Sequence, residues 1–426
     1  MIAVNKNQIK EIIIKEAAIS ELPALLTGLT RERKVYLIVD KNTYQAAGSS
    51  ISMELKKTGF QVEEVFLKGE KIVANTDYFF KLLKELRRDG YFLACGSGTI
   101  NDLARFVSFK LEKPYVIAAT APSMDGYASH VSPITVDGIK ETYNAVTPEA
   151  IVADLDVLKT APWEMIQAGF GDLLGKISAL LDWKLSNILF GVELHQEAVS
   201  LVEGELRRLI ALRADLRSRT TESIETLTKG LVNSGIAMQL VGNSRPASGA
   251  EHHISHFLEM YGEIHGVELP PHGIKVALGE YFVSRLYLKL YELDFAGLVY
   301  IDDYERRRER IRENYLERAV PVLETLEERW NKEQLDTGFL RSKEREIKSL
   351  IEENMEYLQE VEDCLKETGI LEREDIRAID RGWLFKAVQS SFEIRNRYTV
   401  AVLLSQVGLL EEWSHELVDD FEKLIS

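Results

Sequence analysis

The chain has 426 residues, more than one hydrophobic core usually organises, so we expect two domains. Its formal net charge of −16, from 68 acidic and 52 basic residues, argues against nucleic-acid or membrane-surface binding, since no basic patch is long enough to reverse it. The two cysteines, Cys95 and Cys364, give neither a disulfide framework nor a zinc-ribbon spacing, which is typical of a reducing compartment.

The first 160 residues alternate between strand-like and helix-like segments. The start, MIAVNKNQIKEIII, lacks a signal-peptide pattern and the sequence has no apolar run of membrane-span length, so we expect a cytoplasmic protein. We predict a helix over Tyr78–Gly90 and strands over Lys34–Asp40, Gln61–Glu70, Tyr91–Gly98 and Pro114–Ser123. This order predicts a parallel, Rossmann-like α/β sheet in a domain of residues 1–160. The segment SPITVDGIKETYN (Ser132–Asn144) then predicts a hairpin turning at Asp137–Gly138.

Residues 161–426 carry a different pattern. From APWEMIQAGFGDLLGKISALLDWKL onward the apolar residues repeat with a helical period and strand-like runs disappear. The highly charged stretch Asp302–Glu367 resembles a coiled coil, but Pro321 and Gly338 interrupt it too early. The sequence therefore predicts solvated faces of packed bundle helices, in an all-α carboxy-terminal domain of residues 161–426.

A glycine turn follows the predicted strand at Tyr91 and begins the segment GSGTINDLARF. Gly96 and Gly98 would let the backbone approach a pyrophosphate, which a helix amino terminus also attracts. Asn101 stands where a dinucleotide fingerprint has its third glycine. Asp40 ends an earlier strand, where it could accept hydrogen bonds from an adenosine ribose or simply cap a helix. The loop TAPSMDGYAS (Thr120–Ser129) is typical of a cofactor contact.

Histidines cluster in SGAEHHISH (Ser248–His256). His252 and His256 lie four residues apart and share a helix face, whereas His253 is turned about 100° away. Asp172 stands in an apolar stretch, GFGDLLGK, where it could pair with Lys176 instead of serving a site.

A lone histidine, His272, follows two prolines and could equally be a surface-loop residue. Together, Asp172, His252 and His272 form a set suited to a divalent zinc, nickel or iron ion with an open coordination position.

Five motifs occur in a characteristic order: GSGTINDLARF, TAPSMDGYAS, GFGDLLGK, SGAEHHISH and PPHG. Over residues 40–280 or so, they resemble the glycerol-1-phosphate dehydrogenase family. That family belongs to the superfamily of metal-dependent alcohol dehydrogenases, glycerol dehydrogenases and dehydroquinate synthases, which implies a dehydroquinate synthase-like fold. The long charged carboxy-terminal segment resembles the bacterial branch of the family.

The resemblance assigns roles to individual residues. It implies Asp172, His252 and His272 as metal ligands, with Asp172 and His256 acting in catalysis and contacting substrate. It implies a further substrate contact at Asp125, and cofactor contacts at Asp40, Gly96, Ser97, Gly98, Thr99, Ile100, Thr120, Ala121, Pro122, Ser123 and Ser129. Arg245, just before the histidine helix, is our candidate for binding the substrate phosphate. Ile274 departs from the acidic or amide residue that relatives often carry there.

The activity that the resemblance implies is the NAD-dependent, metal-dependent interconversion of dihydroxyacetone phosphate and sn-glycerol 1-phosphate, a step of phospholipid biosynthesis. We expect NAD(H) to be preferred over NADP(H), one nickel or zinc ion, a proton relay through His256, and a homodimer. Two alternatives stay open: a dehydrogenase of glycerol or another small polyol, and a metal-dependent phosphohydrolase. A non-catalytic helical scaffold would leave the order of the motifs unexplained.

Overall fold

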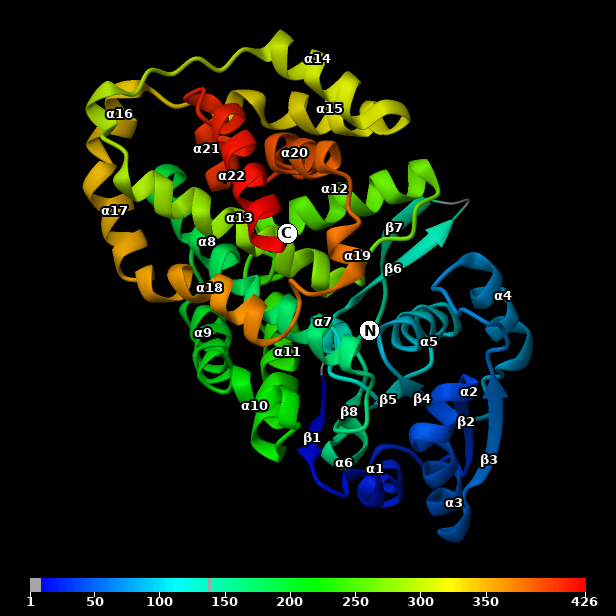
Figure 1. The fold of residues 1–426 in the computed structure, drawn as a ribbon. Coiled ribbons are helices and arrows are strands. Elements are labelled where there is room, and N and C mark those ends of the chain that lie inside the picture. Colours follow the sequence, from blue (N-terminus) through cyan, green and yellow to red (C-terminus); the bar gives the residue numbers. More distant parts are fainter. Residues whose placement is uncertain (1–8, 137–138) are drawn as a thin grey trace. The chain divides into compact units, whose positions relative to one another are not determined.

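The structure is a computed structural model that describes residues 9–136 and 139–426 (Figure 1). The chain divides into two compact units, each built from two stretches of sequence. The first unit comprises Met1–Gly169 and Ala214–Gln239, and the second comprises Phe170–Arg213 and Leu240–Ser426. The domain boundary expected between residues 160 and 161 stays a prediction.

The first unit contains a six-stranded, wholly parallel sheet with the strand order β1-β8-β5-β4-β2-β3. Its inner strands are mostly apolar because helices cover both faces of such a sheet; the exceptions are Lys34 at the start of β2 and Asp154 at the end of β8. This confirms the predicted parallel α/β sheet, although two of its strands, β1 and β8, were not predicted. The strands are β1 (Glu11–Lys15), β2 (Lys34–Val39), β3 (Gln61–Phe66), β4 (Tyr91–Gly96), β5 (Tyr115–Ala119) and β8 (Ala150–Asp154).

Alternate residues of the sheet face different helix layers. Val35, Leu37 and Val39 of β2 share one core cluster with Leu26 and Leu55, which lie on the helices α1 and α3. The helices of this unit outside the boundary regions are α1 (Leu22–Leu29), α2 (Lys41–Thr43), α3 (Ser49–Lys57), α4 (Thr76–Glu85), α5 (Gly98–Leu111) and α6 (Leu155–Leu158). The helix predicted over Tyr78–Gly90 is α4, and it ends earlier, at Glu85, because the backbone turns extended at Leu86.

The predicted hairpin is present as β6 (Val131–Val136) paired antiparallel with β7 (Ile139–Asn144). Its predicted turn, Asp137–Gly138, lies outside the described residues. Three helices lie at or across the boundaries between the units: α7 (Trp163–Leu174), α10 (Arg213–Ser218) and α11 (Thr221–Val241).

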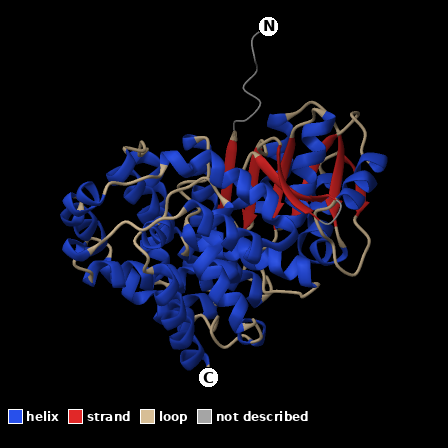
Figure 2. Cartoon of the chain, turned by 90° about the horizontal axis from the view of Figure 1, so that it is seen from above, coloured by secondary structure: helices blue, strands red, loops and turns tan. Residues whose placement is uncertain are grey.

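In residues 170–213 and 240–426 the second unit contains helices joined by loops and no strand, which confirms the predicted all-α region. Figure 2 shows the helices in blue and the strands in red. Its helices are α8 (Lys176–Phe190), α9 (Gln196–Ala211), α12 (Ala250–His265), α13 (His272–Glu292), α14 (Tyr304–Tyr315), α15 (Ala319–Arg329), α16 (Thr337–Ser342), α17 (Glu344–Glu352), α18 (Met355–Glu367), α19 (Glu374–Arg377), α20 (Arg381–Ser390), α21 (Val400–Gln406) and α22 (Leu410–Ile425). None of the helices in the described part of the chain is long and apolar enough to cross a membrane.

Short helices replace a coiled coil in the charged stretch. The break between α14 and α15 falls at Leu316, whose φ is 49°, and Pro321 lies in the first turn of α15. A proline is tolerated there because the first backbone N–H groups of a helix have no partner within the helix.

One buried carboxylate joins four helices of the second unit. Asp182 of α8 accepts hydrogen bonds from the hydroxyl of Tyr287 on α13 (2.6 Å) and from the backbone N–H groups of Ala250 and Val400 (2.8 Å each). Burial, opposed by these hydrogen bonds, raises the pKa of Asp182 to about 7.

Candidate functional site

The glycine turn joins β4 to α5 at the carboxyl edge of the sheet. A Cβ on Gly96 would lie 2.7 Å from Cβ of Ile100, so a larger residue would clash there. The backbone N–H of Asn101 is the first that donates a hydrogen bond within the helix, to Ser97 O at 3.0 Å. The N–H groups of Gly98, Thr99 and Ile100 precede it and therefore have no acceptor within the helix. The predicted residues thus present a helix amino terminus that suits a pyrophosphate.

The loop after β5 lies beside this turn. Thr120 N–H donates to Gly96 O at 3.1 Å, and β4 and β5 are neighbouring strands. The loop continues through Ala121, Pro122 and Ser123, and the buried hydroxyl of Tyr127 donates to Ala121 O at 2.7 Å. Both predicted cofactor segments therefore meet at the edge where parallel α/β sheets bind nucleotides.

A buried arginine that the sequence analysis missed fixes the adjoining loop. Arg105 of α5 is fully buried, forms an ion pair with Asp102 at 2.8 Å, and donates to the carbonyls of Gly126, Tyr127 and Val131. The available signal was an arginine on the apolar face of a helix, where a charged group needs partners.

Asn101, in place of a third glycine, serves the same purpose as this arginine. Its amide donates to Gly126 O at 3.3 Å and accepts from the hydroxyl of Tyr115 at 3.0 Å.

Three other predicted residues have defined partners within the first unit. Asp40 caps α2: its Oδ1 accepts from Thr43 N–H at 2.8 Å, and Thr43 Oγ1 accepts from Asp40 N–H. Asp40 is therefore a helix cap, as one of the two alternatives predicted, and its contact with a ribose stays a prediction. Asp125 accepts from the hydroxyl of Ser234 at 2.9 Å, and Ser129 Oγ accepts from Val131 N–H at 3.1 Å.

Asp172, His252 and His272 converge in the second unit from α7, α12 and α13. One ligand atom of each lies within 4.8 Å of the others, and Asp172 Oδ1 is 3.5 Å from His252 Nε2. Two glycines allow this convergence: a Cβ on Gly171 would lie 2.3 Å from Gly273 O, and one on Gly175 would lie 2.5 Å from the side chain of Val276.

Two glutamates that the sequence analysis missed orient the imidazoles. Glu251 Oε1 lies 2.6 Å from His252 Nδ1, and Glu259 Oε1 lies 2.8 Å from His272 Nδ1. Carboxylates at Nδ1 direct the other ring nitrogen, Nε2, toward a metal ion and raise its basicity. One carboxylate and two oriented imidazoles thus fit a divalent ion with an open coordination position. Both glutamates stand near the histidines in the sequence, but an acid beside a histidine is too common to be a signal.

Asp172 also forms the ion pair that the alternative interpretation predicted. Lys176 Nζ lies 2.7 Å from Asp172 Oδ1, is fully buried, and also donates to Ala247 O at 2.9 Å. Burial alone would raise the pKa of Asp172, but Lys176 and His252 outweigh it and hold that pKa well below its ordinary value. The carboxylate is therefore ionised and available to a cation.

His256 lies next to this cluster. Its ring centroid is 6.1 Å from that of His252 and 5.5 Å from that of His272, and Nδ1 lies 3.5 Å from Glu259 Oε2. Burial lowers the pKa of His256 to about 4, so the ring is neutral at neutral pH.

Three further residues from the sequence analysis lie on or just before the helices α12 and α13. His253, on another face of α12, is fully buried, so it is not solvated. Ile274 is also fully buried, and the contact to His272 Nδ1 comes from Glu259 on α12 instead. Arg245 lies in the turn before α12.

Known proteins resemble this chain in sequence. A family model for iron-containing alcohol dehydrogenase matches residues 13–162. Proteins named glycerol-1-phosphate dehydrogenase [NAD(P)+] are similar: that of Halalkalibacterium halodurans is 35% identical over 315 residues, covering 71% of this chain and 78% of its own, and that of Bacillus subtilis is 36% identical over 296 residues, covering 67% and 74%. A relative of that name from Pyrococcus horikoshii is 31% identical over 281 residues, covering 65% of this chain and 78% of its own.

Solved structures share the fold at low identity. Glycerol dehydrogenase from Schizosaccharomyces pombe superposes with a TM-score of 0.61 at 16% identity, covering 97% of this chain and 92% of its own. Iron-containing alcohol dehydrogenase from Corynebacterium glutamicum gives a TM-score of 0.61 at 14% identity, covering 100% of both chains. These likenesses confirm the predicted fold class.

Proposed function

Because the chain belongs to the glycerol-1-phosphate dehydrogenase family, we propose that it interconverts dihydroxyacetone phosphate and sn-glycerol 1-phosphate with NAD(P)(H) and one divalent metal ion. The observation that carries the proposal is the Asp172, His252 and His272 cluster, whose two imidazoles each have a carboxylate at Nδ1. In the reduction, hydride passes from NADH to C2 of dihydroxyacetone phosphate and one proton is taken up at the oxygen on C2. We propose this as the physiological direction.

Asp172, His252 and His272 would hold the metal ion, which we propose to be nickel or zinc. A bound ion would polarise the C2 oxygen and lower the pKa of the C2 hydroxyl. Glu251 and Glu259 keep the two rings in the orientation that exposes Nε2.

His256 would move the proton. Since Nδ1 contacts Glu259, Nε2 is the nitrogen left to exchange a proton with substrate. In the oxidation the neutral ring accepts the proton of the C2 hydroxyl, and in the reduction it returns that proton. We propose that Asp125 is a further substrate contact.

The residues Gly96–Ile100 and Thr120–Ser123, with Ser129, would bind the dinucleotide, its pyrophosphate lying at the amino terminus of α5. Asp40 would accept hydrogen bonds from the ribose and repel a 2′-phosphate, so we propose that NADH is preferred over NADPH. In the helix cap of α2, Oδ1 of this carboxylate accepts from Thr43 N–H at 2.8 Å.

The test is NADH oxidation with dihydroxyacetone phosphate, run on metal-stripped protein and after reconstitution with Ni²⁺ or Zn²⁺. We expect turnover only after reconstitution, and much faster than with unphosphorylated dihydroxyacetone. Faster turnover of the unphosphorylated substrate would favour a glycerol or small-polyol dehydrogenase. Phosphate release without NADH binding would favour a phosphohydrolase.

We also propose that the protein is a homodimer of the cytoplasm. Its free cysteines, Cys95 and Cys364, are both buried thiols, which suits a reducing compartment. Light scattering after size-exclusion chromatography would measure the oligomeric state.

A further inference from the structure

Three arginines of the second unit lie close together beside the histidine helix. Arg397 donates from Nη2 to the hydroxyl of Ser244 at 3.0 Å and from Nη1 to the carbonyl of Ser248. These bonds tie the segment that precedes α21 to the turn that precedes α12, and Arg245 lies in that turn. Burial lowers the pKa of Arg397 to about 10, and the positive charge of Arg245 contributes to that shift.

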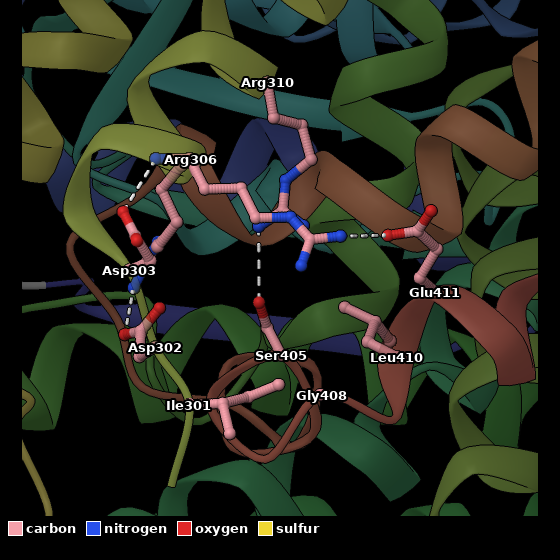
Figure 3. A pocket seen from close by; sticks show the side chains of 10 residues that line it. Ile301, Asp302, Asp303, Arg306, Arg310, Ser405, Gly408, Leu410 and Glu411 are labelled. Atoms are coloured by element: carbon pink, nitrogen blue, oxygen red, sulfur yellow. Dashed lines mark hydrogen bonds and ion pairs between the residues drawn. The ribbon is translucent and has the colours of Figure 1, made fainter.

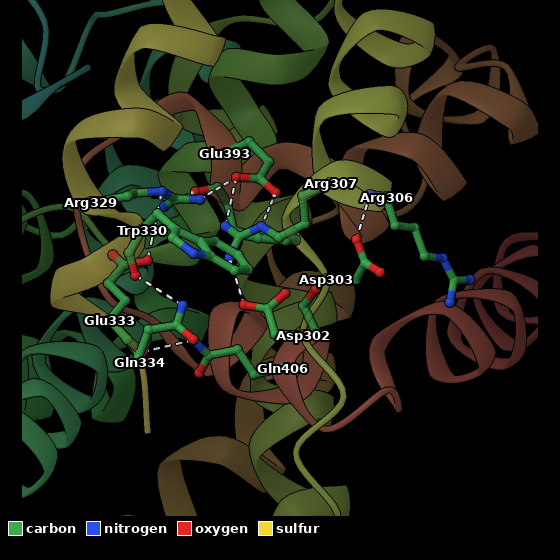
Figure 4. Close-up of polar contacts among 12 residues, drawn as sticks. Asp302, Asp303, Arg306, Arg307, Arg329, Trp330, Glu333, Gln334, Glu393 and Gln406 are labelled. Carbon is green, nitrogen blue, oxygen red and sulfur yellow. Dashed lines mark hydrogen bonds and ion pairs between the residues drawn. The ribbon is translucent and has the colours of Figure 1, made fainter. Parts of the chain in front are cut away.

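A buried network that the sequence analysis did not foresee fixes the backbone at Arg395. Figure 4 shows the two arginines and the glutamate at the centre of this network. Arg307 and Arg329 share the carboxylate of Glu393: Arg307 Nε lies 2.8 Å from Oε1, and Arg329 also contacts Oε2. Arg329 Nη1 in addition donates to the carbonyls of Phe392 (2.8 Å) and Arg395 (3.0 Å). The backbone at Arg395 is thus fixed by a fully buried arginine, while the Arg395 residue itself is exposed.

The segment that carries Arg395 follows a short helix that packs against α12, on which the proposed catalytic histidine lies. Burial is the main cause of the low pKa of His256, and the positive charge of Arg395 contributes to it. Arg395 and Arg397 also contribute, after burial, to the low pKa of His253. The short 3-10 helix Ser391–Ile394, which directly precedes Arg395, packs against α12, the helix that bears His256.

In the described part of the chain, no carboxylate pairs with the guanidinium group of Arg245 or of Arg395. Among the described residues, no hydrogen bond or ion pair involves either side chain, and desolvation alone lowers the pKa of each. By contrast, Arg307 and Arg329 have Glu393. Two neighbouring guanidinium groups without a carboxylate partner are therefore available to bind an anion.

A second group of arginines in this unit gives a useful comparison (Figure 3). It lines a pocket of about 60 Å³, which is too small for a phosphorylated substrate. Its charges are compensated, because Arg306 pairs with Glu411 at 3.2 Å and Arg307 pairs with Asp302 at 3.1 Å. Because these arginines are paired with carboxylates, they do not need a bound anion to balance their charge.

We infer that the guanidinium groups of Arg245 and Arg395 bind the phosphate group of the three-carbon substrate, and that Arg397 is a positioning residue that holds their two segments together. This inference rests on the proposed function and extends it, because it assigns the choice of a phosphorylated over an unphosphorylated substrate to named residues. It also gives the carboxy-terminal helical region a direct role at the active site. Arginine suits this role because its planar fork donates two hydrogen bonds to one phosphate.

The test compares Arg395→Gln and Arg245→Gln with the control Arg306→Gln, all as metal-loaded, full-length protein. Each of the first two variants should raise KM for dihydroxyacetone phosphate roughly 10- to 100-fold, the range for losing one hydrogen bond to a charged group. KM for NADH, and the rate with unphosphorylated dihydroxyacetone, should not change. Titration calorimetry with sn-glycerol 1-phosphate should show the same loss of affinity without any turnover. Arg306→Gln should resemble wild type, and Arg395→Lys should recover part of the affinity.

The outcomes separate the inference from the function on which it rests. If the wild-type protein does not reduce dihydroxyacetone phosphate, the proposed function and the inference both fail. If the wild type does and both glutamine variants keep its KM and its affinity for sn-glycerol 1-phosphate, the inference alone is overturned. A rise in KM for NADH instead would assign the arginines to a cofactor phosphate and would also overturn it. Neither side chain has a hydrogen-bond or ion-pair partner among residues 9–136 and 139–426, so the variants should fold, and circular dichroism checks that they do.

Discussion

Replacing Asp172 by Asn separates two roles of one carboxylate, metal ligand and ion-pair partner. Asp172 is 1% exposed, and Lys176, 2.7 Å away, is fully buried. Removing the carboxylate leaves a buried ammonium group without this counter-charge, a change that typically costs about 3–5 kcal/mol. We therefore expect the free energy of unfolding of the metal-free protein to fall by about 3–5 kcal/mol in Asp172→Asn.

A solvated ion pair with the same spacing provides the control. Glu344 and Lys348 are also four residues apart on a helix and 2.9 Å apart, but their side chains are 32% and 31% exposed. Glu344→Gln should change the free energy of unfolding by less than about 0.5 kcal/mol. A double variant, Asp172→Asn with Lys176→Met, removes both buried charges and should recover most of the lost stability.

Two measurements decide between the roles. Chemical unfolding followed by tryptophan fluorescence gives the stability, and elemental analysis after reconstitution with Ni²⁺ gives the metal content. Both the single and the double Asp172 variants should bind metal weakly, because two imidazoles remain. A double variant with wild-type metal content would refute the ligand role. A single variant as stable as wild type would refute the argument from burial.

Three further predictions concern the same two units. His252→Ala should lose both metal and activity, whereas His253→Ala should keep both. His256→Ala should keep most of its metal but lose turnover by roughly 10²- to 10⁴-fold. Metal analysis and kcat of all three variants check this, and metal loss in His253→Ala alone would contradict it. Asp40→Ser keeps a side chain that can cap the helix but removes the negative charge, so the ratio of kcat/KM for NADH to kcat/KM for NADPH should fall. An unchanged ratio would mean that Asp40 serves only as a helix cap. Because burial raises the folded-state pKa of Asp182 to about 7, this group's contribution to stability is lost as pH rises from about 4 to 7, by up to about 1.4 kcal/mol per pH unit. Asp182→Asn should lack this slope in urea unfolding across that range, and an unchanged slope would contradict the shift.

The fold was predictable where local pattern and tertiary role agree. The strands β2, β4 and β5 are apolar runs that the sheet buries on both faces, so their sequences alone indicate strands. The strand β1, EIIIK, is short and lies between charged residues, and it pairs with β8 about 140 positions further along the chain. No local pattern reports such a pairing, and β1 was missed. The strand β8, AIVAD, was missed although it is itself a buried, largely apolar run.

The candidate site divides in the same way. The residues that the family motifs carry, Asp172, His252 and His272, could be named from the sequence, and the structure brings them together. Glu259 could not, because its contact with His272 depends on how α12 packs against α13. Arg395 could not for the same reason: its position follows from a carboxylate and two arginines brought together by tertiary packing.

The hydrogen bonds of Asp182 also bear on how the protein is made. Its partners follow at Ala250, Tyr287 and Val400, and the last is 218 residues downstream. A ribosome adding roughly 5–20 residues per second needs on the order of 10–40 seconds to supply that final donor. Throughout that interval the nascent second unit carries an incompletely bonded acid among exposed apolar helices, the condition under which chains aggregate or engage chaperones. The speed of translation through residues 183–400 therefore sets how long this acid stays incompletely bonded.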